Sequence, residues 1–322
     1  MYTDCLSRIS LERIEKASQT IDPVFLHSPQ FLSEPISAEL GVRIALKVEI
    51  VNPIRSFKGR GTDFLASGLS KDSPVLVCAS AGNFGQGLAY ACRKRRMPLI
   101  VYAAENANPL KLDRMRNFGA EVRLAGADFD AAKEAARGFA ARTGACYIED
   151  GREPAITEGA GSIAVELCDW PDQIDVLLVP LGNGALAGGI GHWLKAHRPK
   201  TRVVAVCAVG APSMAISLRE HRVHSAAAVS TIADGIAVRV PVPEALDDLA
   251  DVIDEVLLVD DDAMIQSMRM VFRHHGLVVE PAGVAGLAAA VTFRERFRDA
   301  AIATPLCGGN LTTEQIEKWL WR

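Results

Sequence analysis

One lysine of the chain, Lys58, stands in a setting that could make its side-chain amine reactive. It lies in the stretch Asn52-Pro53-Ile54-Arg55-Ser56-Phe57-Lys58-Gly59-Arg60-Gly61, between a β-rich run and a helical pattern. Because Pro53 cannot lie inside a central strand, the strand should end before it, and we expect Lys58 at a strand-to-helix corner. Two nearby arginines and partial burial both disfavour an ammonium ion, and a free amine can form a Schiff base with a carbonyl compound. A solvated lysine in a basic loop is the alternative interpretation.

A glycine-rich stretch after the β-rich run 75–79 has the composition of an anion-binding turn. Its sequence is Ser80-Ala81-Gly82-Asn83-Phe84-Gly85-Gln86-Gly87. Glycine and serine at a helix N-terminus leave backbone N–H groups free to hold a carboxylate or a phosphate. The alternative is a simple strand-to-helix turn in which Ser80 or Asn83 caps the helix.

A second glycine cluster follows the run 175–180 and repeats this arrangement. It reads Pro180-Leu181-Gly182-Asn183-Gly184-Ala185-Leu186-Ala187-Gly188-Gly189. No Gly-Lys-Ser/Thr follows, as it would in a P-loop, and the G-x-G-x-x-G spacing of dinucleotide binders is missing. The functional interpretation is a cradle for one small phosphate, and the alternative is close packing of a helix on a sheet.

Two further motifs could each add one side chain to a site. Cys307, in Leu306-Cys307-Gly308-Gly309-Asn310, follows the last β-rich run. It is either a buried thiol or, at the carboxyl end of a parallel strand, a group that faces a ligand crevice. Glu280 precedes Pro281 at the start of a helix and is either a surface acid favoured by the helix dipole or a site residue.

The elements that must position these residues alternate between strands and helices. The β-rich runs are 43–48, 75–79, 99–103, 121–124, 175–180, 202–208, 255–259 and 300–306, and the helical patterns are 10–17, 62–69, 83–96, 110–118, 128–143, 156–170 and 261–275. Such alternation predicts an α/β fold of mostly parallel sheets with helices on their faces. We expect residues 75–150 to form a small mobile domain inserted into a large domain of residues 1–74 and 151–322. A ligand would bind in the cleft between them.

Composition narrows the class of protein. The 322 residues are 49% hydrophobic and carry a formal net charge of -4, so no basic field points to nucleic acid or to an anionic membrane. No apolar run reaches the roughly 18 residues that a membrane span needs. The seven cysteines include no C-x-x-C pair, and the histidines form neither a metal nor a Ser-His-Asp pattern. We therefore expect a cytoplasmic globular protein without a metal site.

Six spaced motifs together resemble the serine/threonine dehydratases, which are fold-type-II pyridoxal-phosphate enzymes. The motifs are Ser56-Phe57-Lys58-Gly59-Arg60-Gly61, Ser80-Ala81-Gly82-Asn83, the 182–186 loop, Thr231-Ile232-Ala233-Asp234-Gly235, Glu280-Pro281-Ala282-Gly283 and Cys307-Gly308-Gly309-Asn310. The resemblance extends from about residue 42 to residue 310. It implies the two-lobe fold of the tryptophan synthase β-like enzymes and pyridoxal 5'-phosphate as cofactor.

The resemblance also implies a role for each matching residue. Lys58 would be the catalytic residue and would form the Schiff base with the cofactor, while Phe57 would pack against the cofactor ring. Asn83 would bond the ring hydroxyl, and Cys307 would face the pyridine nitrogen. The other implied cofactor contacts are the backbone N–H groups of Gly182, Asn183, Gly184, Ala185 and Leu186 around the phosphate, together with Gly235 and Glu280. The implied substrate contacts are Ser80, Ala81, Gly82, Asn83 and Gln86.

Three departures from the family pattern affect these expectations. Ala81 stands where the related serine racemases have a serine that serves the opposite face of the substrate, so racemisation is disfavoured. Cys207 and Ser213 stand where some relatives have two acids that bind a divalent cation, so we expect no metal there. Gly59 replaces a larger apolar residue and 183–185 replaces a run of glycines, which suggests an altered pocket shape.

The resulting expectation is dehydration and deamination of a β-hydroxy amino acid, L-threonine or L-serine, to a 2-oxo acid and ammonia. The freed amine of Lys58 would remove the Cα proton as a general base, and negative charge would spread into the cofactor. One alternative is another β-elimination or β-replacement, on a modified serine or threonine or on a catabolic hydroxy-amino acid. The other is a cofactor-binding protein without turnover. The expected partners are an amino-acid substrate and a second copy of the chain in a homodimer, without nucleic acid or membrane.

Overall fold

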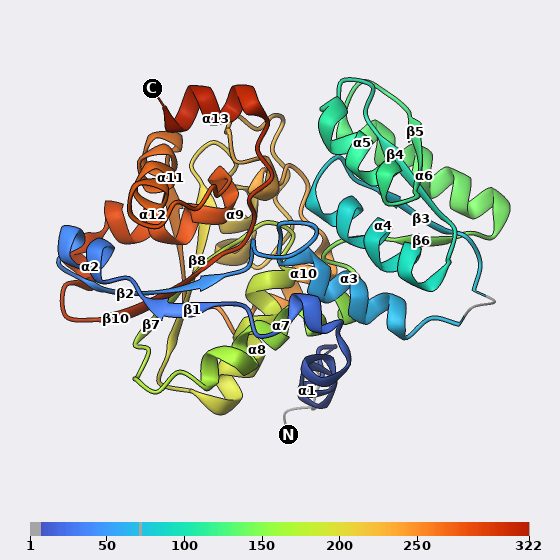
Figure 1. The fold of residues 1–322 in the computed structure, drawn as a ribbon. Helices are drawn as coiled ribbons and strands as arrows, with labels where there is room; N and C mark the ends of the chain where they lie inside the picture. The colour runs from blue at the N-terminus through green and yellow to red at the C-terminus, as the bar shows by residue number, and fades with distance from the viewer. Residues whose placement is uncertain (1–7, 71–72, 322) are drawn as a thin grey trace.

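The strands of the protein form two separate sheets, each with its own helices (Figure 1). The computed structural model describes residues 8–70 and 73–321. In spatial order, the six-stranded sheet contains β1 (Gln30–Leu32), β2 (Arg43–Val48), β10 (Ala301–Leu306), β7 (Val176–Pro180), β8 (Arg202–Ala208) and β9 (Glu255–Val259). The four-stranded sheet contains β5 (Glu121–Leu124), β4 (Leu99–Ala103), β3 (Leu76–Ala79) and β6 (Cys146–Ile148). All paired strands are parallel except β1, which is antiparallel to β2.

The helices that cover these sheets follow the strands in a regular alternation. They are α1 (Leu11–Thr20), α2 (Glu34–Leu40), α3 (Lys58–Ser67), α4 (Asn83–Arg95), α5 (Pro109–Asn117), α6 (Phe129–Thr143), α7 (Pro154–Cys168), α8 (Ala185–His197), α9 (Ser213–Glu220), α10 (Pro243–Leu249), α11 (Asp261–His275), α12 (Ala285–Thr292) and α13 (Thr313–Leu320). We call the four-stranded sheet with α4, α5 and α6 the small lobe and the remaining elements the large lobe. None of the helices within the described ranges is long and apolar enough to span a membrane.

Both faces of the large sheet are buried, as the near-continuous apolar runs of its strands require. Successive side chains of a strand point to opposite faces, and β8 shows the result. Val204 and Val206 belong to a core with α11, α12 and α13, whereas Val203 and Ala205 belong to a core with α1, α7 and α8. In Figure 1, α11 to α13 and α7 with α8 lie on opposite sides of this sheet. The small sheet is covered in the same way, by α4 and α5 on one face and by α6 on the other.

The predicted α/β fold with mostly parallel sheets is confirmed. Each of the eight β-rich runs is a strand whose end matches the prediction and whose start differs by at most one residue. The two three-residue strands β1 and β6 were not predicted, and neither were the seven- and eight-residue helices α2, α9, α10 and α13. The domain boundaries and the mobility expected for residues 75–150 stay predictions.

The helix expected over 62–69 begins earlier, at Lys58. Its first turn contains two glycines, which are needed there because neighbouring residues pack closely against the helix. A Cβ on Gly59 would lie 2.2 Å from the Phe25 ring, and one on Gly61 would lie 2.4 Å from the carbonyl oxygen of Ile156. The Phe25 ring therefore fills the space left by the missing side chain of Gly59. The altered pocket shape expected from Gly59 stays a prediction.

A buried ion network fixes α3 to the large lobe. The guanidinium of Arg60, whose side chain is 0% exposed, donates to both oxygens of Glu49, each at 2.8 Å. It also donates to both oxygens of Glu166, at 2.5 and 2.9 Å, and Lys47 Nζ donates to Glu166 at 2.5 Å. Buried charges persist only when they are paired in this way. Arg60 lies within one helical turn of Lys58, so the network fixes the start of α3 and with it the position of Lys58.

Candidate active site

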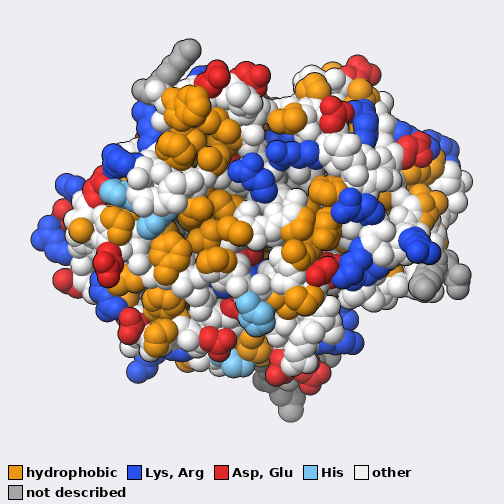
Figure 2. Space-filling model, viewed as in Figure 1, with side chains coloured by type: hydrophobic (Ala, Val, Ile, Leu, Met, Phe, Trp, Pro, Cys, Tyr) orange, Lys and Arg blue, Asp and Glu red, His pale blue; other side chains and the backbone are white. Residues whose placement is uncertain are grey.

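The predicted loops meet at a cavity of about 560 Å³ lined by residues of both lobes. Its walls include the start of α3, the loop after β3, the residues after β6, the loop after β7 and Cys307 after β10. The carboxyl ends of parallel strands are where open α/β sheets bind ligands. The structure therefore brings together in one place residues that are far apart in the sequence. On the face shown in Figure 2, basic and acidic side chains are interspersed and hydrophobic side chains gather toward the centre and upper left.

Lys58 is the first residue of α3, and its amine lies in this cavity. Its Nζ atom lies 4.8 Å from the centre of the Phe57 ring. The surroundings differ from the expected cationic setting, since both oxygens of Asp150 accept hydrogen bonds from Nζ, at 2.7 and 2.8 Å. Arg60 is turned away and paired with buried acids. A carboxylate, and not a second cation, is therefore the nearest charged partner of this amine.

Asp150 is a site residue that the sequence analysis did not identify. It comes two residues after β6, at the carboxyl end of a parallel strand, and Asn183 Nδ2 also donates to it, at 3.3 Å. The available signal was the position of an acid directly after a strand, but a three-residue strand gives too short a pattern to recognise. Asp150 lies between the lysine and the loop that follows β7.

The loop after β3 combines a capped helix start with open backbone. Ser80 Oγ accepts hydrogen bonds from the backbone N–H groups of Gly82, at 3.2 Å, and Gly85, at 2.9 Å. Its hydroxyl thus holds the turn, as the capping alternative proposed, while Ala81 and Gly82 line the cavity. Gln86 is buried in α4 outside the cavity lining, and its Nε2 atom has no hydrogen-bond partner among the described residues. Direct contact of Gln86 with a substrate stays a prediction.

The loop after β7 forms an anion cradle at the N-terminus of α8. Gly184 has φ +96°, a left-handed conformation that favours glycine, and it places the chain at the start of the helix without a side-chain cap. The first intrahelical N–H is that of Gly188, which donates to the carbonyl of Gly184 at 2.8 Å. Residues 182 and 184–186 line the cavity along with Asn183. The N–H groups of the first turn, together with the helix dipole, are suited to bind a phosphate.

A hydrogen-bonded acid, Glu280, lines the same cavity beside Asn83. Glu280 accepts from Asn83 Nδ2 at 2.7 Å and from the backbone N–H of Asn310 at 3.0 Å. Burial, and next the charge of Asp234, raise the pKa of Glu280 to about 7. Burial, and next the charge of Glu280, raise the pKa of the Cys307 thiol above its ordinary value. The cavity therefore presents a neutral thiol at the end of β10.

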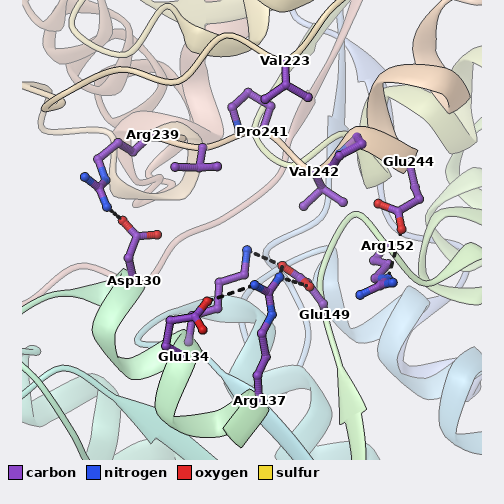
Figure 3. A pocket seen from close by; sticks show the side chains of 13 residues that line it. Asp130, Glu134, Arg137, Glu149, Arg152, Val223, Arg239, Pro241, Val242 and Glu244 are labelled. Carbon is purple, nitrogen blue, oxygen red and sulfur yellow. Dashed lines mark hydrogen bonds and ion pairs between the residues drawn. The ribbon is translucent and has the colours of Figure 1, made fainter.

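A second cavity, of about 540 Å³, adjoins the first and is lined mainly by charged side chains (Figure 3). Arg239 of the large lobe forms an ion pair with Asp130 of α6, and Glu149 pairs with Lys133 and with Arg137. None of these residues was identified from the sequence, because their charges are scattered over more than 100 positions without a motif. Among the residues that the structure describes, no group of three or more His, Cys, Asp or Glu side chains is placed to hold a metal ion.

Known proteins share this architecture and much of this sequence. A family model described as "Pyridoxal-phosphate dependent enzyme" matches residues 22–308. The L-threonine ammonia-lyase of Thermotoga maritima is 31% identical over 312 residues, which cover 96% of this chain and 78% of that protein. The L-threonine ammonia-lyase of Geobacter sulfurreducens is 31% identical over 90% of this chain and 72% of its own length.

Solved structures with the same fold include a deaminase and a racemase. The processed form of threonine deaminase isoform 2 from Solanum lycopersicum superposes with a TM-score of 0.88 at 28% identity, covering 96% of this chain and 88% of that one. A pyridoxal 5'-phosphate-dependent aspartate racemase superposes with a TM-score of 0.88 at 29% identity, covering 98% and 99% of the two chains.

The cavity fits the cofactor that this family requires. A lysine amine lies in it, the glycine-rich turn before α8 offers unbonded backbone N–H groups to a phosphate, and the neutral Cys307 thiol is part of its lining. Glycine is also needed where the loops meet, because a Cβ on Gly182 would lie 2.7 Å from the carbonyl oxygen of Gly235. Since the family model covers most of the chain and these residues suit its cofactor, the protein belongs to the family of pyridoxal-phosphate dependent enzymes.

Proposed function

We propose that this protein is an ammonia-lyase that dehydrates and deaminates a β-hydroxy amino acid, such as L-threonine or L-serine, to a 2-oxo acid and ammonia. The observation that carries the proposal is the convergence of the Lys58 amine, the 80–86 turn and the 182–186 turn on one cavity. The threonine ammonia-lyases that are about 30% identical over most of the chain support it.

The residues of the cavity divide into three tasks. The cofactor, when bound, supplies an electron sink for the charge that develops at the substrate Cα. Lys58 carries the amine that binds the cofactor and then removes and returns protons as a general base and acid. The backbone N–H groups of 182–186 hold the phosphate, and those of 81–83 hold the substrate carboxylate, while Asn83 orients the ring hydroxyl.

The neutral Cys307 thiol at the end of β10 favours elimination over a long-lived carbanion. A thiol whose pKa is raised by burial carries no negative charge at neutral pH, so Cys307 cannot hold a pyridine nitrogen protonated as a carboxylate would. The electron sink is then weaker, and departure of the β-hydroxyl competes better with proton return. Ala81 stands where the related serine racemases have a serine, so this position supplies no acid or base to the opposite face of the substrate.

The deciding experiment is release of 2-oxo acid from L-threonine and L-serine by the protein with pyridoxal phosphate, compared with the Lys58→Ala variant. We expect release by the wild type to fall by about 1,000-fold or more in Lys58→Ala, since the amine acts both as nucleophile and as base. Lys195→Ala, which removes an amine paired with Asp254 on the surface, should keep the wild-type rate. No release from any β-hydroxy amino acid, or equal rates in Lys58→Ala, would contradict the proposal.

We also propose that the enzyme is a cytoplasmic homodimer. The cysteines of the described residues are all free thiols, which suits a reducing compartment. The dimer rests on the resemblance to dehydratases, which are commonly dimers. Sedimentation equilibrium at micromolar concentration tests it, and a mass near 34.5 kDa would contradict it.

A further inference from the structure

The cavity that contains Lys58 is lined by more acids than bases. Its cations are Lys58, Lys111, Lys133 and Arg239, and its acids are Asp128, Asp130, Glu149, Asp150, Asp234 and Glu280. Each of the four cations is paired with one acid: Lys111 with Asp234, Lys133 with Glu149, Arg239 with Asp130 and Lys58 with Asp150. Among the described lining residues, therefore, no cation is left over for an acidic group on a substrate.

The two remaining acids are held by neutral donors. Glu280 accepts from the amides of Asn83 and Asn310, at 2.7 and 3.0 Å. Asp128 is exposed and caps α6 through a hydrogen bond from the N–H of Ala131, at 2.9 Å. Asp128 thus leaves the charge balance of the cavity negative, Glu280 adds to it in so far as it is ionised near its raised pKa of about 7, and the phosphate of a bound cofactor adds further negative charge.

The proposed reaction weakens one of the four ion pairs, that of Lys58 with Asp150. An ammonium group has three N–H donors, and Lys58 uses its donors to hold both oxygens of Asp150. When a primary amine condenses with an aldehyde, water is released and the nitrogen keeps at most one N–H, so it can donate to only one carboxylate oxygen. When the substrate amine later takes its place, the freed Lys58 amine must be uncharged to act as a base, so it is no longer a cationic partner of Asp150. The Asp150 side chain is only 13% exposed, and its remaining protein donor is the neutral Asn183 amide at 3.3 Å.

A carboxylate in such a place needs a new partner, because a buried charge without one is costly. We propose that Asp150 binds a positively charged group in the substrate side chain, so that the enzyme prefers a β-hydroxy amino acid that carries a second amino group. Apolar side chains of the same cavity, among them Phe129, Val238 and Val240, are suited to contact the aliphatic stem of such a substrate. This inference rests on the proposed function and names its substrate class.

Binding of two matched amino acids tests the inference without turnover. L-Ornithine and its isostere L-norleucine both lack a β-hydroxyl, and each is titrated into the pyridoxal-phosphate-loaded protein while the cofactor absorbance is followed. We expect the dissociation constant of L-ornithine to be at least tenfold lower than that of L-norleucine. Equal constants, or tighter binding of L-norleucine, would overturn the inference in the wild-type protein itself.

Variants of Asp150 assign the preference to its carboxylate. Asp150→Asn and Asp150→Ser should each lower the preference for L-ornithine, measured as the ratio of the L-norleucine to the L-ornithine dissociation constant, at least tenfold. Asp172→Asn removes an exposed acid paired with Arg43 on the large lobe and should change neither constant. A preference for L-ornithine that persists in both Asp150 variants would sink the assignment.

Turnover separates this inference from the proposed function. The panel is 3-hydroxyornithine, the neutral 3-hydroxynorleucine and the acidic 3-hydroxyaspartate, and the readout is release of 2-oxo acid. We expect kcat/KM to be highest for 3-hydroxyornithine and lowest for 3-hydroxyaspartate. Release that is fastest from a neutral or acidic member would overturn the inference and leave the ammonia-lyase proposal standing. No release from any member of the panel, nor from L-threonine or L-serine, would overturn the proposed function instead.

Discussion

Glu166 is the residue on which the buried ion network beneath Lys58 depends. Burial alone would raise its pKa, but the hydrogen bonds and charge of Arg60, with those of Lys47, outweigh burial and lower the pKa of Glu166 to about 2. Because this pKa lies below the ordinary value, the ionised carboxylate stabilises the folded state above about pH 4.5. That contribution is lost as the pH falls from about 4.5 toward 2.

Glu166→Gln leaves buried cations without their acid, so we expect the free energy of unfolding to fall by about 3 kcal/mol at pH 7. Urea unfolding at pH 7, 5 and 4 measures the difference from wild type, which should be constant above pH 5 and begin to narrow at pH 4. Glu295→Gln removes an acid that is 66% exposed and should change stability by less than about 1 kcal/mol. A Glu166→Gln protein as stable as wild type at pH 7 would show that the network is energetically neutral.

At this scale, the sequence predicted the residues that lie in recognisable motifs. Strand ends and helix starts leave a pattern of apolar runs and glycines in the sequence. Such places contain Lys58 and the turns at 80–83 and 182–186. Asp150 left no such pattern, because β6 before it has three residues. The pairing of Lys58 with an acid depends on the contact of two segments 92 positions apart, which local composition does not encode.

Helix α3 is the element that carries Lys58, and its first turn is packed against Phe25. A Cβ at position 59 would lie 2.2 Å from the Phe25 ring, which belongs to a buried cluster with Ile21, Ile54 and Phe64. We expect Gly59→Ala to lower the free energy of unfolding by about 1–3 kcal/mol, because overpacking outweighs the gain in helix propensity. Thermal or urea unfolding measures it.

The control for this prediction lies at the other end of the same helix. Gly68 has φ -85°, and a Cβ there would make only an ordinary 3.5 Å contact with the carbonyl oxygen of Leu65. Gly68→Ala should therefore be neutral or slightly stabilising. Adding Phe25→Leu to Gly59→Ala should cost less than the sum of the two single changes, since the smaller side chain makes room. Strict additivity would mean that the ring is not the obstacle.

Long apolar strands were predictable from the sequence, whereas short strands and the start of α3 were not. Five- to seven-residue runs of mostly apolar residues, such as 175–180 and 202–208, are buried central strands, and their boundaries were predicted to within a residue. The strand β1 has three residues and forms only through antiparallel pairing with β2, so its signal is tertiary. The start of α3 was placed late, because glycines that usually interrupt a helix are required here by close packing.

The two lobes of the molecule are linked across the cavity by ion pairs that residues 234–239 of the large lobe form with the small lobe. Asp234 pairs with Lys111 of α5, and Arg239 pairs with Asp130 of α6, so residues 234–239 of the large lobe are attached to two helices of the small lobe. Asp234 is 61% exposed and Arg239 is 37% exposed, so salt should weaken both pairs. This segment also lines the cavity, which links lobe contact to access to the site.

We expect the double variant Lys111→Ala/Arg239→Ala to loosen this segment without unfolding either lobe. Two partly exposed pairs together are worth about 1–2 kcal/mol, so amide hydrogen exchange in residues 225–240 should accelerate by about 5- to 30-fold. Wild-type protein in 0.5 M NaCl should show a smaller change in the same direction, and Arg298→Ala, which removes an exposed pair with Glu295, should show none. Acceleration throughout the small sheet would mean that the pairs stabilise the lobe itself, and unchanged exchange would mean that apolar contacts alone hold the segment across the cavity.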